Sequence, residues 1–549
     1  MSNSKKIGAF LENGFLVSPD ALIVIEEDSK DSVVLYKKLN EKKSQEKLVV
    51  VNKDILSLIH QKKEIIDINW KEFERAKSLI EKGKDRGGYD TFLDLLNYEE
   101  KKEKLNKILS EVQKPEKNIK IEPTSAIEPS VIVLQSYNKK PKKREVGDFV
   151  KHFKVRYDKI KNILTNHQAL QNIISIGKLK LKKEREPVTL IGLVRDKRIN
   201  KNGNTFLTLE DPTGEIKVLI SKNNRSLGEI AKEIVLDEVL AISGTLGKDI
   251  VFANKIIFPG LPLNKELKKS PNEVYAAFIS DIHVGSRSFL AKPFLNFINW
   301  LNGNTSNEKL KKIGEGVKYL FIAGDLVAGV GVYPGQETDL IIPDIKKQYE
   351  ELAEYLLKIP KNINVIIAPG NHDATRLSEP QPPLDKNFAK PIWDLPNAIL
   401  VSSPSLINIH SSETFPGFDV LLYHGSSYHY YKTEVESLRL RKAHENPTLV
   451  TEFLLQKRHI APTHESTVYI PDDEEDPLII EKVPDVFVTG DHHRSATSLI
   501  NNINLISCSC FQKKTDYEEK RGYEPDPGMV PVLNLKTREV KILDFNQDE

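Results

Sequence analysis

The chain has 549 residues, of which 39% are hydrophobic, and its 80 basic and 78 acidic side chains leave a formal net charge of +2. This length predicts two to four domains, and the near balance of charges excludes a strongly basic chain, so any contact with DNA must come from local patches. The two cysteines, Cys508 and Cys510, are too few for a disulfide scaffold or a zinc site of four cysteines. Since the chain shows no signal-like stretch and no apolar run of membrane-spanning length, we expect a cytoplasmic protein without membrane contact.

The N-terminal part of the chain divides into two segments by composition. Residues 1–112 carry apolar side chains at helical spacing, which predicts a helical N-terminal region. Residues 113–145 contain four prolines and few aromatic side chains, which predicts a linker. A basic cluster at residues 139–144 could contact DNA phosphates or serve as a solvated tether, and we favour the tether.

Residues 146–264 predict a small β-barrel domain. An amphipathic helix begins near Asp148, and β-rich runs separated by turn sequences follow it. Five strands, with a helix expected near 227–234 between the third and the fourth, fit the oligonucleotide/oligosaccharide-binding (OB) fold. The expected strands are 187–195, 205–210, 215–220, 238–246 and 250–258.

Five short apolar runs in the last half of the chain each end in residues of metal-binding type. Runs of this kind indicate strands that are buried on both faces. In an open α/β sheet, ligands gather beyond the carboxyl ends of such strands, so we expect these side chains to share one crevice. Run 274–280 is followed by Asp281 and His283, and run 318–324 by Asp325. Run 364–370 is followed by Asn371, His372 and Asp373. Run 420–423 is followed by His424, and run 486–490 by Asp491, His492 and His493.

The mixture of imidazole, carboxylate and amide oxygen in these motifs indicates two divalent ions. Such a pair can clamp the attacking and leaving oxygens of a phosphodiester, and one carboxylate must then lie between the ions. Asp325 suits that position because each of its oxygens can hold one ion. The donor types favour Mn, with Mg, Fe or Zn as alternatives.

The order of these motifs resembles that of the calcineurin-like metallophosphoesterase superfamily. Within this superfamily, five segments are similar in sequence to the small subunits of archaeal family D DNA polymerases. They are residues 280–287, 324–334, 369–376, 379–382 and 457–462. The resemblance implies that residues 272–549 form an α/β phosphoesterase sandwich of two β-sheets flanked by helices. In the related polymerase B-subunits the barrel mainly packs on the phosphoesterase domain and on the catalytic subunit, so we place docking ahead of independent strand binding.

The resemblance also assigns roles to the residues at the strand ends. It implies one metal site of Asp281, His283, Asp325 and His493, and a second of Asp325, Asn371, His424 and Asp491. His372 would be catalytic without ligating, acting on the developing charge or the leaving oxygen, and Asp373 would orient its ring.

The last motif departs from the Gly-His-x-His pattern of the superfamily, because it reads Gly490-Asp491-His492-His493. Either Asp491 ligates the second ion directly, or His492 takes that role and Asp491 supports a neighbouring imidazole. We favour Asp491, because alternate side chains past a strand converge while adjacent ones diverge.

The resemblance implies a 3′→5′ exonuclease that acts on single-stranded or mispaired DNA ends. It would proofread for the large catalytic subunit of a family D DNA polymerase, and a sliding clamp is a further candidate partner. Arg287 and Arg376 lie beside the metal motifs and could bind substrate phosphates or pair with a neighbouring acid. The alternatives are a double-strand-break-repair nuclease, a protein phosphatase, which the Leu-Val-Ala-Gly sequence after Asp325 disfavours, and a scaffold B-subunit that has lost catalysis.

Three further segments have simpler interpretations. His459 and His464 lie far from the strand-end motifs, which predicts structural or substrate-facing roles. The acidic residues in 471–477 predict a solvated surface loop, and alternating apolar residues in 531–545 predict a terminal hairpin.

Overall fold

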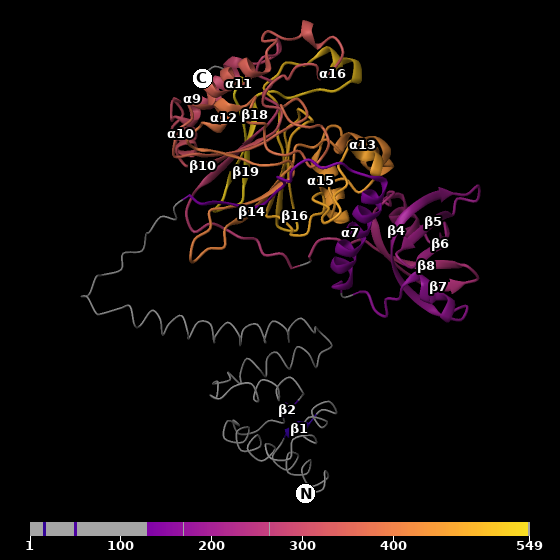
Figure 1. The fold of residues 1–549 in the computed structure, drawn as a ribbon. Helices are drawn as coiled ribbons and strands as arrows, with labels where there is room; N and C mark the ends of the chain where they lie inside the picture. The colour runs from indigo at the N-terminus through magenta and orange to yellow at the C-terminus, as the bar shows by residue number, and fades with distance from the viewer. Residues whose placement is uncertain (1–14, 18–48, 52–128, 168, 263, 547–549) are drawn as a thin grey trace. The chain divides into compact units, whose positions relative to one another are not determined.

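The computed structural model describes residues 15–17, 49–51, 129–167, 169–262 and 264–546 (Figure 1). The chain divides into two compact units, residues 1–123 and 124–549. In the first unit, β1 (Phe15–Val17) and β2 (Val49–Val51) pair in parallel, and the rest of the predicted helical region 1–112 lies outside the described residues. Among the described residues, no helix combines the length and apolar character needed to cross a bilayer.

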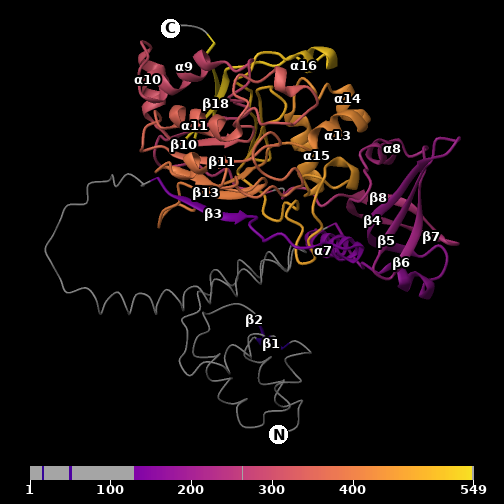
Figure 2. The ribbon, with the colours of Figure 1, turned by 45° about the horizontal axis from the view of Figure 1, so that its top comes forward.

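The second unit contains a six-stranded sheet that carries the first three strand-end motifs. Its central strands pair in parallel, so their carboxyl ends meet at one edge. Helices cover its outer face, as Figure 2 shows. Apolar side chains of these helices and of the sheet form one buried cluster. In sheet order the strands are β12 (Ala398–Leu400), β11 (Asn364–Ala368), β10 (Val317–Ala323), β9 (Tyr275–Ile279), β18 (Met529–Asn534) and β19 (Val540–Asp544), and the helices are α9 (Ala291–Leu301), α10 (Glu308–Glu315), α11 (Ile345–Leu356) and α12 (Lys390–Trp393).

A second six-stranded sheet carries the remaining two motifs. Its outer face packs against a cluster of short helices, and the 3-10 turns η2 (Gln336–Thr338) and η3 (His464–Ser466) lie in connecting loops. In sheet order the strands are β16 (Ala496–Ile500), β17 (Ile503–Ser507), β15 (Val486–Thr489), β14 (Phe418–Leu422), β13 (Ser405–Ile409) and β3 (Val131–Ser136), and the helices are α13 (Tyr428–Glu434), α14 (Glu436–Leu440), α15 (Thr448–Lys457) and, after β17, α16 (Asp516–Arg521).

A shared apolar core lies between the two sheets. It draws on β9, β10 and β11 of the first sheet and on β13, β14 and β15 of the second. Phe278 and Phe321 stack there with ring centres 5.4 Å apart. Burial on this face and under the helices explains why these strands are continuously apolar instead of alternating. The predicted terminal hairpin is confirmed, because β18 and β19 pair antiparallel.

The predicted linker contains a strand of the second sheet. Residues Val131–Ser136 form β3 and pair antiparallel with β13, which lies about 270 residues later in the chain. The prediction of a linker over 113–145 is therefore wrong for this segment. Its proline-rich flanks hid a strand whose partner β13 is distant in sequence.

The predicted OB barrel is confirmed in strand number and order of elements. Helix α7 (Val146–Thr165) and the turn η1 (Ile176–Leu181) precede a closed barrel, shown in magenta in Figure 1, and α8 (Arg225–Lys232) follows its third strand. The strands are β4 (Pro187–Ile199), β5 (Thr205–Asp211), β6 (Gly214–Ile220), β7 (Val239–Gly247) and β8 (Ile250–Ile257).

Ionic contacts join the segment before α7 to the acidic loop. Lys139 Nζ lies 3.0 Å from Asp472 Oδ1, Arg144 Nη2 lies 3.4 Å from Asp472 Oδ2, and Lys142 pairs with Asp473. The basic cluster is therefore not a solvated tether, and the acidic loop is not simply a solvated loop. Each segment neutralises the other, which leaves less positive charge for DNA phosphates.

A buried ionic cluster lies where α7 meets the loops of the second sheet, and it explains His459. Arg156 Nε donates to Asp476 Oδ2 at 2.8 Å, and His459 Nε2 lies 3.0 Å from the same oxygen. Arg156, His459 and Asp476 are each at most 1% exposed. His459 is thus structural, whereas His464 is exposed and contacts the Tyr469 hydroxyl at 2.8 Å.

Candidate metal centre

Five of the predicted site residues occupy left-handed backbone conformations directly after their strands. The φ angles are 52° at Asp281, 55° at His283, 51° at Asp325, 67° at Asp491 and 53° at His493. Non-glycine residues adopt such angles at a cost, and they gather at functional sites. The sharp turns aim these side chains back across the ends of both sheets.

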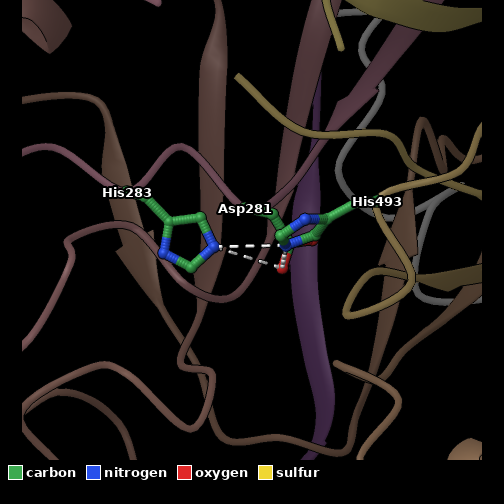
Figure 3. Close-up of side chains that lie close together, drawn as sticks. All are labelled: Asp281, His283 and His493. Carbon is green, nitrogen blue, oxygen red and sulfur yellow. Dashed lines mark hydrogen bonds and ion pairs between the residues drawn. The ribbon is translucent and has the colours of Figure 1, made fainter. Parts of the chain in front are cut away.

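Asp281, His283 and His493 form the first cluster, and their side chains point toward one another in Figure 3. The Nε2 atoms of the two histidines are 3.3 Å apart, and His493 Nε2 lies 3.3 Å from Asp281 Oδ1. Neither Asp281 Oδ1 nor His283 Nδ1 finds a hydrogen-bond partner among the described residues, although both are buried. Buried polar atoms are normally satisfied, so the cluster suits an additional group.

Three oxygens surround His424 Nε2 in the second cluster. Asn371 Oδ1 lies 2.9 Å away, Asp325 Oδ1 3.5 Å and Asp491 Oδ1 3.7 Å. The other oxygen of Asp325, Oδ2, lies 3.9 Å from His283 Nε2 in the first cluster. The two oxygens of Asp325 thus face the two clusters, which is the arrangement that a shared ligand requires.

The spacing of these donor atoms fits two divalent ions. Ligand bonds of about 2.1 Å in a tetrahedron place neighbouring donor atoms about 3.4 Å apart. Most of the donor separations in the two clusters lie near that value, and the donors are the nitrogen and oxygen types that Mn, Fe and Zn accept. The residues predicted from the sequence as metal ligands are therefore brought together in two adjoining clusters.

Hydrogen bonds through Nδ1 hold two of the imidazoles with Nε2 toward the centre. His424 Nδ1 lies 2.7 Å from the Ala323 carbonyl oxygen, and His493 Nδ1 lies 2.7 Å from Glu518 Oε1. Such outer partners fix the tautomer of a ligating histidine. Glu518 was missed in the sequence, where its only signal is Thr515-x-x-Glu518, the capping box of α16.

The electrostatics of the clusters follow from burial opposed by close counter-charges. Burial and the neighbouring His372 hold the pKa of His283 well below its ordinary value, so its ring stays neutral, as a ligand must be. Burial alone would raise the pKa of Asp325, but the imidazoles of His424 and His372 lower that pKa well below its usual range. Asp325 is therefore ionised in the folded chain.

Close backbone packing leaves room only for glycine at the base of the centre. A Cβ at Gly370 would lie 2.2 Å from Asp325 Oδ1 and 2.8 Å from His424 Cε1. The glycine before Asn371 is thus required by the approach of Asp325 and His424, the same two side chains that meet in the second cluster.

Comparison with known proteins places the whole arrangement in a family. The chain is 42% identical over 397 residues to the DNA polymerase II small subunit of Pyrococcus furiosus, a match that covers 72% of this chain and 63% of that protein. It is 36% identical over 415 residues to the DNA polymerase II small subunit of Methanothermobacter thermautotrophicus, covering 76% of this chain and 83% of that protein. The chain belongs to the DNA polymerase II small-subunit family.

Two broader families match the domains of this small-subunit chain separately. The family of B subunits of DNA polymerases alpha and epsilon matches residues 277–498, a range that contains all five strand-end motifs. The OB-fold nucleic acid binding domain matches residues 188–258, which form the barrel.

Asp373 has a different role from the predicted one of orienting His372. Its carboxylate accepts hydrogen bonds from the backbone N–H of Gly370 at 2.8 Å and of Leu326 at 3.2 Å, and from the Tyr349 hydroxyl at 3.1 Å. The His372 ring is held instead through Nδ1, 2.8 Å from the Ala328 carbonyl oxygen. The prediction that Asp373 orients His372 is therefore wrong: Asp373 braces the loop that carries it, and burial together with Asp325 raises its pKa to about 7.

The region around Asp491 contains two more histidines. Asp491 Oδ2 lies 3.0 Å from His429 Nε2 and 3.5 Å from His492 Nδ1, while Oδ1 faces His424. The rings of His429 and His492 stack with centres 5.0 Å apart. Asp491 thus reaches the second cluster, whereas His492 lies behind it against α13. His429 was missed because no strand-end motif marks it.

The two arginines proposed as phosphate-binding residues both donate to backbone carbonyls. Arg287 Nε lies 2.9 Å from the Thr338 oxygen, and Arg376 Nη2 lies 2.6 Å from the Pro380 oxygen. The Arg376 guanidinium also lies over the Tyr137 ring, 5.2 Å from its centre. Through these contacts, both arginine side chains fix loops at the edge of the candidate metal centre.

Proposed function

We propose that the chain is the 3′→5′ exodeoxyribonuclease subunit of a two-subunit replicative DNA polymerase. The observation that supports this proposal is the pair of clusters that share Asp325, with Asp281 Oδ1 buried and without a hydrogen-bond partner among the described residues. Two adjoining sites of nitrogen and oxygen ligands suit phosphodiester hydrolysis. The names of the relatives supply the polymerase setting.

Two divalent ions, with Mn favoured, would be held by the two clusters. One would use Asp281, His283, Asp325 and His493, and the other Asp325, Asn371, His424 and Asp491. When bound, they would supply Lewis-acid stabilisation of the negative charge that develops on the phosphoryl oxygens.

His372 is the group that we assign to proton transfer. Its Nδ1 is held at the Ala328 carbonyl, so the exchangeable position is Nε2, which lies 3.8 Å from Asp325 Oδ2. In its protonated form, Nε2 can give a proton to the departing 3′-oxygen of DNA. Partial exposure of the ring, with 20% of the side chain accessible, leaves it within reach of a substrate.

We infer that the partner is the large catalytic subunit of the polymerase and that the substrate is a single-stranded or mispaired 3′ end of DNA. The barrel is fixed to the phosphoesterase-like part by a buried pair, Lys457 Nζ to Glu238 Oε2 at 2.9 Å, with both side chains 1% exposed. Such a fixed barrel suits docking to a partner better than a flexible strand-binding arm.

The test uses the complex with its large subunit, 3′-labelled single-stranded DNA and Mn. Asp325→Asn keeps the shape of the side chain but removes the shared charge, so cleavage should fall by several orders of magnitude and bound metal should drop, with the circular dichroism spectrum unchanged. Asp394→Asn, an exposed carboxylate beside Lys390, is the matched control and should cleave normally. Absence of both cleavage and bound metal in the natural complex would support a scaffold subunit instead.

A further inference from the structure

A cavity of about 570 Å³ opens beside the metal centre and shares residues with it. Asn371 and His372 form one side, and the segments around residues 330–332 and 374–388 form the others. This volume lies in the range of small-ligand sites, about 300–1,000 Å³. Metal binding and proton transfer at the centre use none of the cavity beyond Asn371 and His372.

Large apolar side chains of the cavity are exposed to solvent. Leu377 is 65% exposed, Val330 50% and Phe388 40%. Three exposed apolar side chains around one cavity mark a surface that is covered when the protein works. Since Asn371 and His372 line the cavity, one molecule can occupy it and the candidate metal centre together.

The charges around the cavity indicate which part of a DNA strand would enter. Asp385 presents an exposed carboxylate in the lining, which would repel a phosphate but can accept hydrogen bonds from the amino groups of a base. The exposed Lys346 stands at the rim, with Nζ 5.8 Å from the centre of the Phe388 ring. The aromatic face of Phe388, with the cations of Arg376 in the lining and Lys346 at the rim, matches a base and its phosphate.

We propose that this cavity binds the nucleobase of the 3′-terminal nucleotide, stacked on Phe388, while the adjoining phosphodiester lies at Asn371 and His372. The proposal rests on the proposed nuclease function and adds the feature of the substrate that the site recognises. A base that is paired in a duplex must first be unstacked, at a cost of a few kcal/mol that is smallest for a mispaired or single-stranded base. The cavity thereby selects frayed and mispaired ends.

The experiment compares two 3′-labelled single strands, one with a normal terminal nucleotide and one with an abasic terminal residue. With the natural two-subunit complex and Mn, we expect kcat/KM to be roughly 10-fold or more higher for the normal strand, because base stacking on an aromatic ring carries that much discrimination. In Phe388→Ala and in a second variant, Leu377→Ser, the ratio should move toward one, while cleavage of the abasic strand stays unchanged.

Phe252→Ala is the matched control, since Phe252 is 45% exposed on the barrel strand β8, away from the cavity. It should keep the natural ratio. Equal cleavage of both strands by the natural complex overturns the proposal. An unchanged ratio in both cavity variants, together with dissociation of the large subunit, also overturns it and assigns the cavity to the protein partner. If neither strand is cut by the natural complex, the nuclease function itself fails, and the cavity assignment falls with it.

Discussion

The candidate metal centre and the ionic cluster under α7 are both buried groups of acids and histidines, yet they differ in how their polar atoms are paired. In the ionic cluster, Asp476 accepts from Arg156 and from the Leu478 backbone N–H, and His459 Nδ1 accepts from the Ala461 N–H. At the metal centre, Asp281 Oδ1 and His283 Nδ1 lack hydrogen-bond partners among the described residues.

This difference separates buried charges that satisfy one another from buried polar atoms that are open to a ligand. Buried ionic groups that satisfy one another need nothing more, and removal of one partner leaves the other uncompensated. Buried acceptors without a hydrogen-bond partner among the described residues, such as Asp281 Oδ1, are compensated when a cation joins them. Substitutions in the two regions should therefore affect different measurements.

The largest effect is expected at His372, which should change chemistry alone. His372→Ala should lower kcat by roughly 10²–10⁴-fold, the range for a lost general acid, and leave the bound metal unchanged, because His372 completes neither cluster in our assignment. Stopped-flow cleavage and metal analysis of the same sample measure both. His464→Ala, at an exposed histidine, is the control, and loss of one metal equivalent in His372→Ala would make His372 a ligand.

A substitution in the ionic cluster should change the fold alone. Asp476→Asn leaves the buried Arg156 guanidinium without its carboxylate, so we expect the free energy of unfolding to fall by about 3–5 kcal/mol. Asp473→Asn, in the same loop but nearer its surface, should lower the stability far less, because ion pairs open to solvent contribute little. Denaturant unfolding measures the difference, and per-molecule nuclease activity should remain normal in both variants. Equal free energies of unfolding for Asp476→Asn and Asp473→Asn would contradict the stabilising role of the ionic cluster.

Glu518 tests whether the metal centre depends on the partners of its ligands. In Glu518→Gln the neutral side chain has one acceptor oxygen for both His493 Nδ1 and the Thr515 N–H. Metal affinity should fall roughly 10–100-fold, as for other outer partners of ligating histidines, with little change in the stability of the metal-free chain. Titration of Mn followed by melting temperature gives the affinity. The neighbouring exposed Glu519→Gln should bind as the natural chain does.

The smallest expected effect is a pH dependence that arises from His459. Burial and the neighbouring Arg156 lower the pKa of His459 to about 4. The unfolded chain protonates this residue below its ordinary pKa of about 6.5 while the folded chain does not, so stability is full above pH 6.5 and declines as the pH falls toward 4. At pH 5.5 the loss should be about 1.4 kcal/mol. Unfolding of His459→Gln at pH 7 and 5.5 should show a decline smaller by that amount, and an equal decline would contradict the assignment.

The contrast also explains what could be predicted from the sequence. The barrel and the strand-end ligands followed from local patterns, because each strand, turn and polar end is contiguous in the chain. The ring orientation of His372 depends on the Ala328 carbonyl, which arrives from another loop, and nothing near Asp373 in the sequence distinguishes bracing of a loop from orienting a histidine. Likewise Glu518 and His429 reach the site through tertiary packing: the capping box marks Glu518 only as part of a helix start, and no strand-end motif marks His429.

Strand β3 has a consequence for how the chain folds during synthesis. The ribosome delivers β3 first, then the whole barrel, and only much later the partner strand β13 (Ser405–Ile409). Pairings across such sequence separations form slowly, and unpaired strands are exposed to aggregation in the meantime. The barrel, whose strands are neighbours in sequence, can close before β3 has its partner strand. Completion of the second sheet therefore depends on segments that are synthesised long after β3.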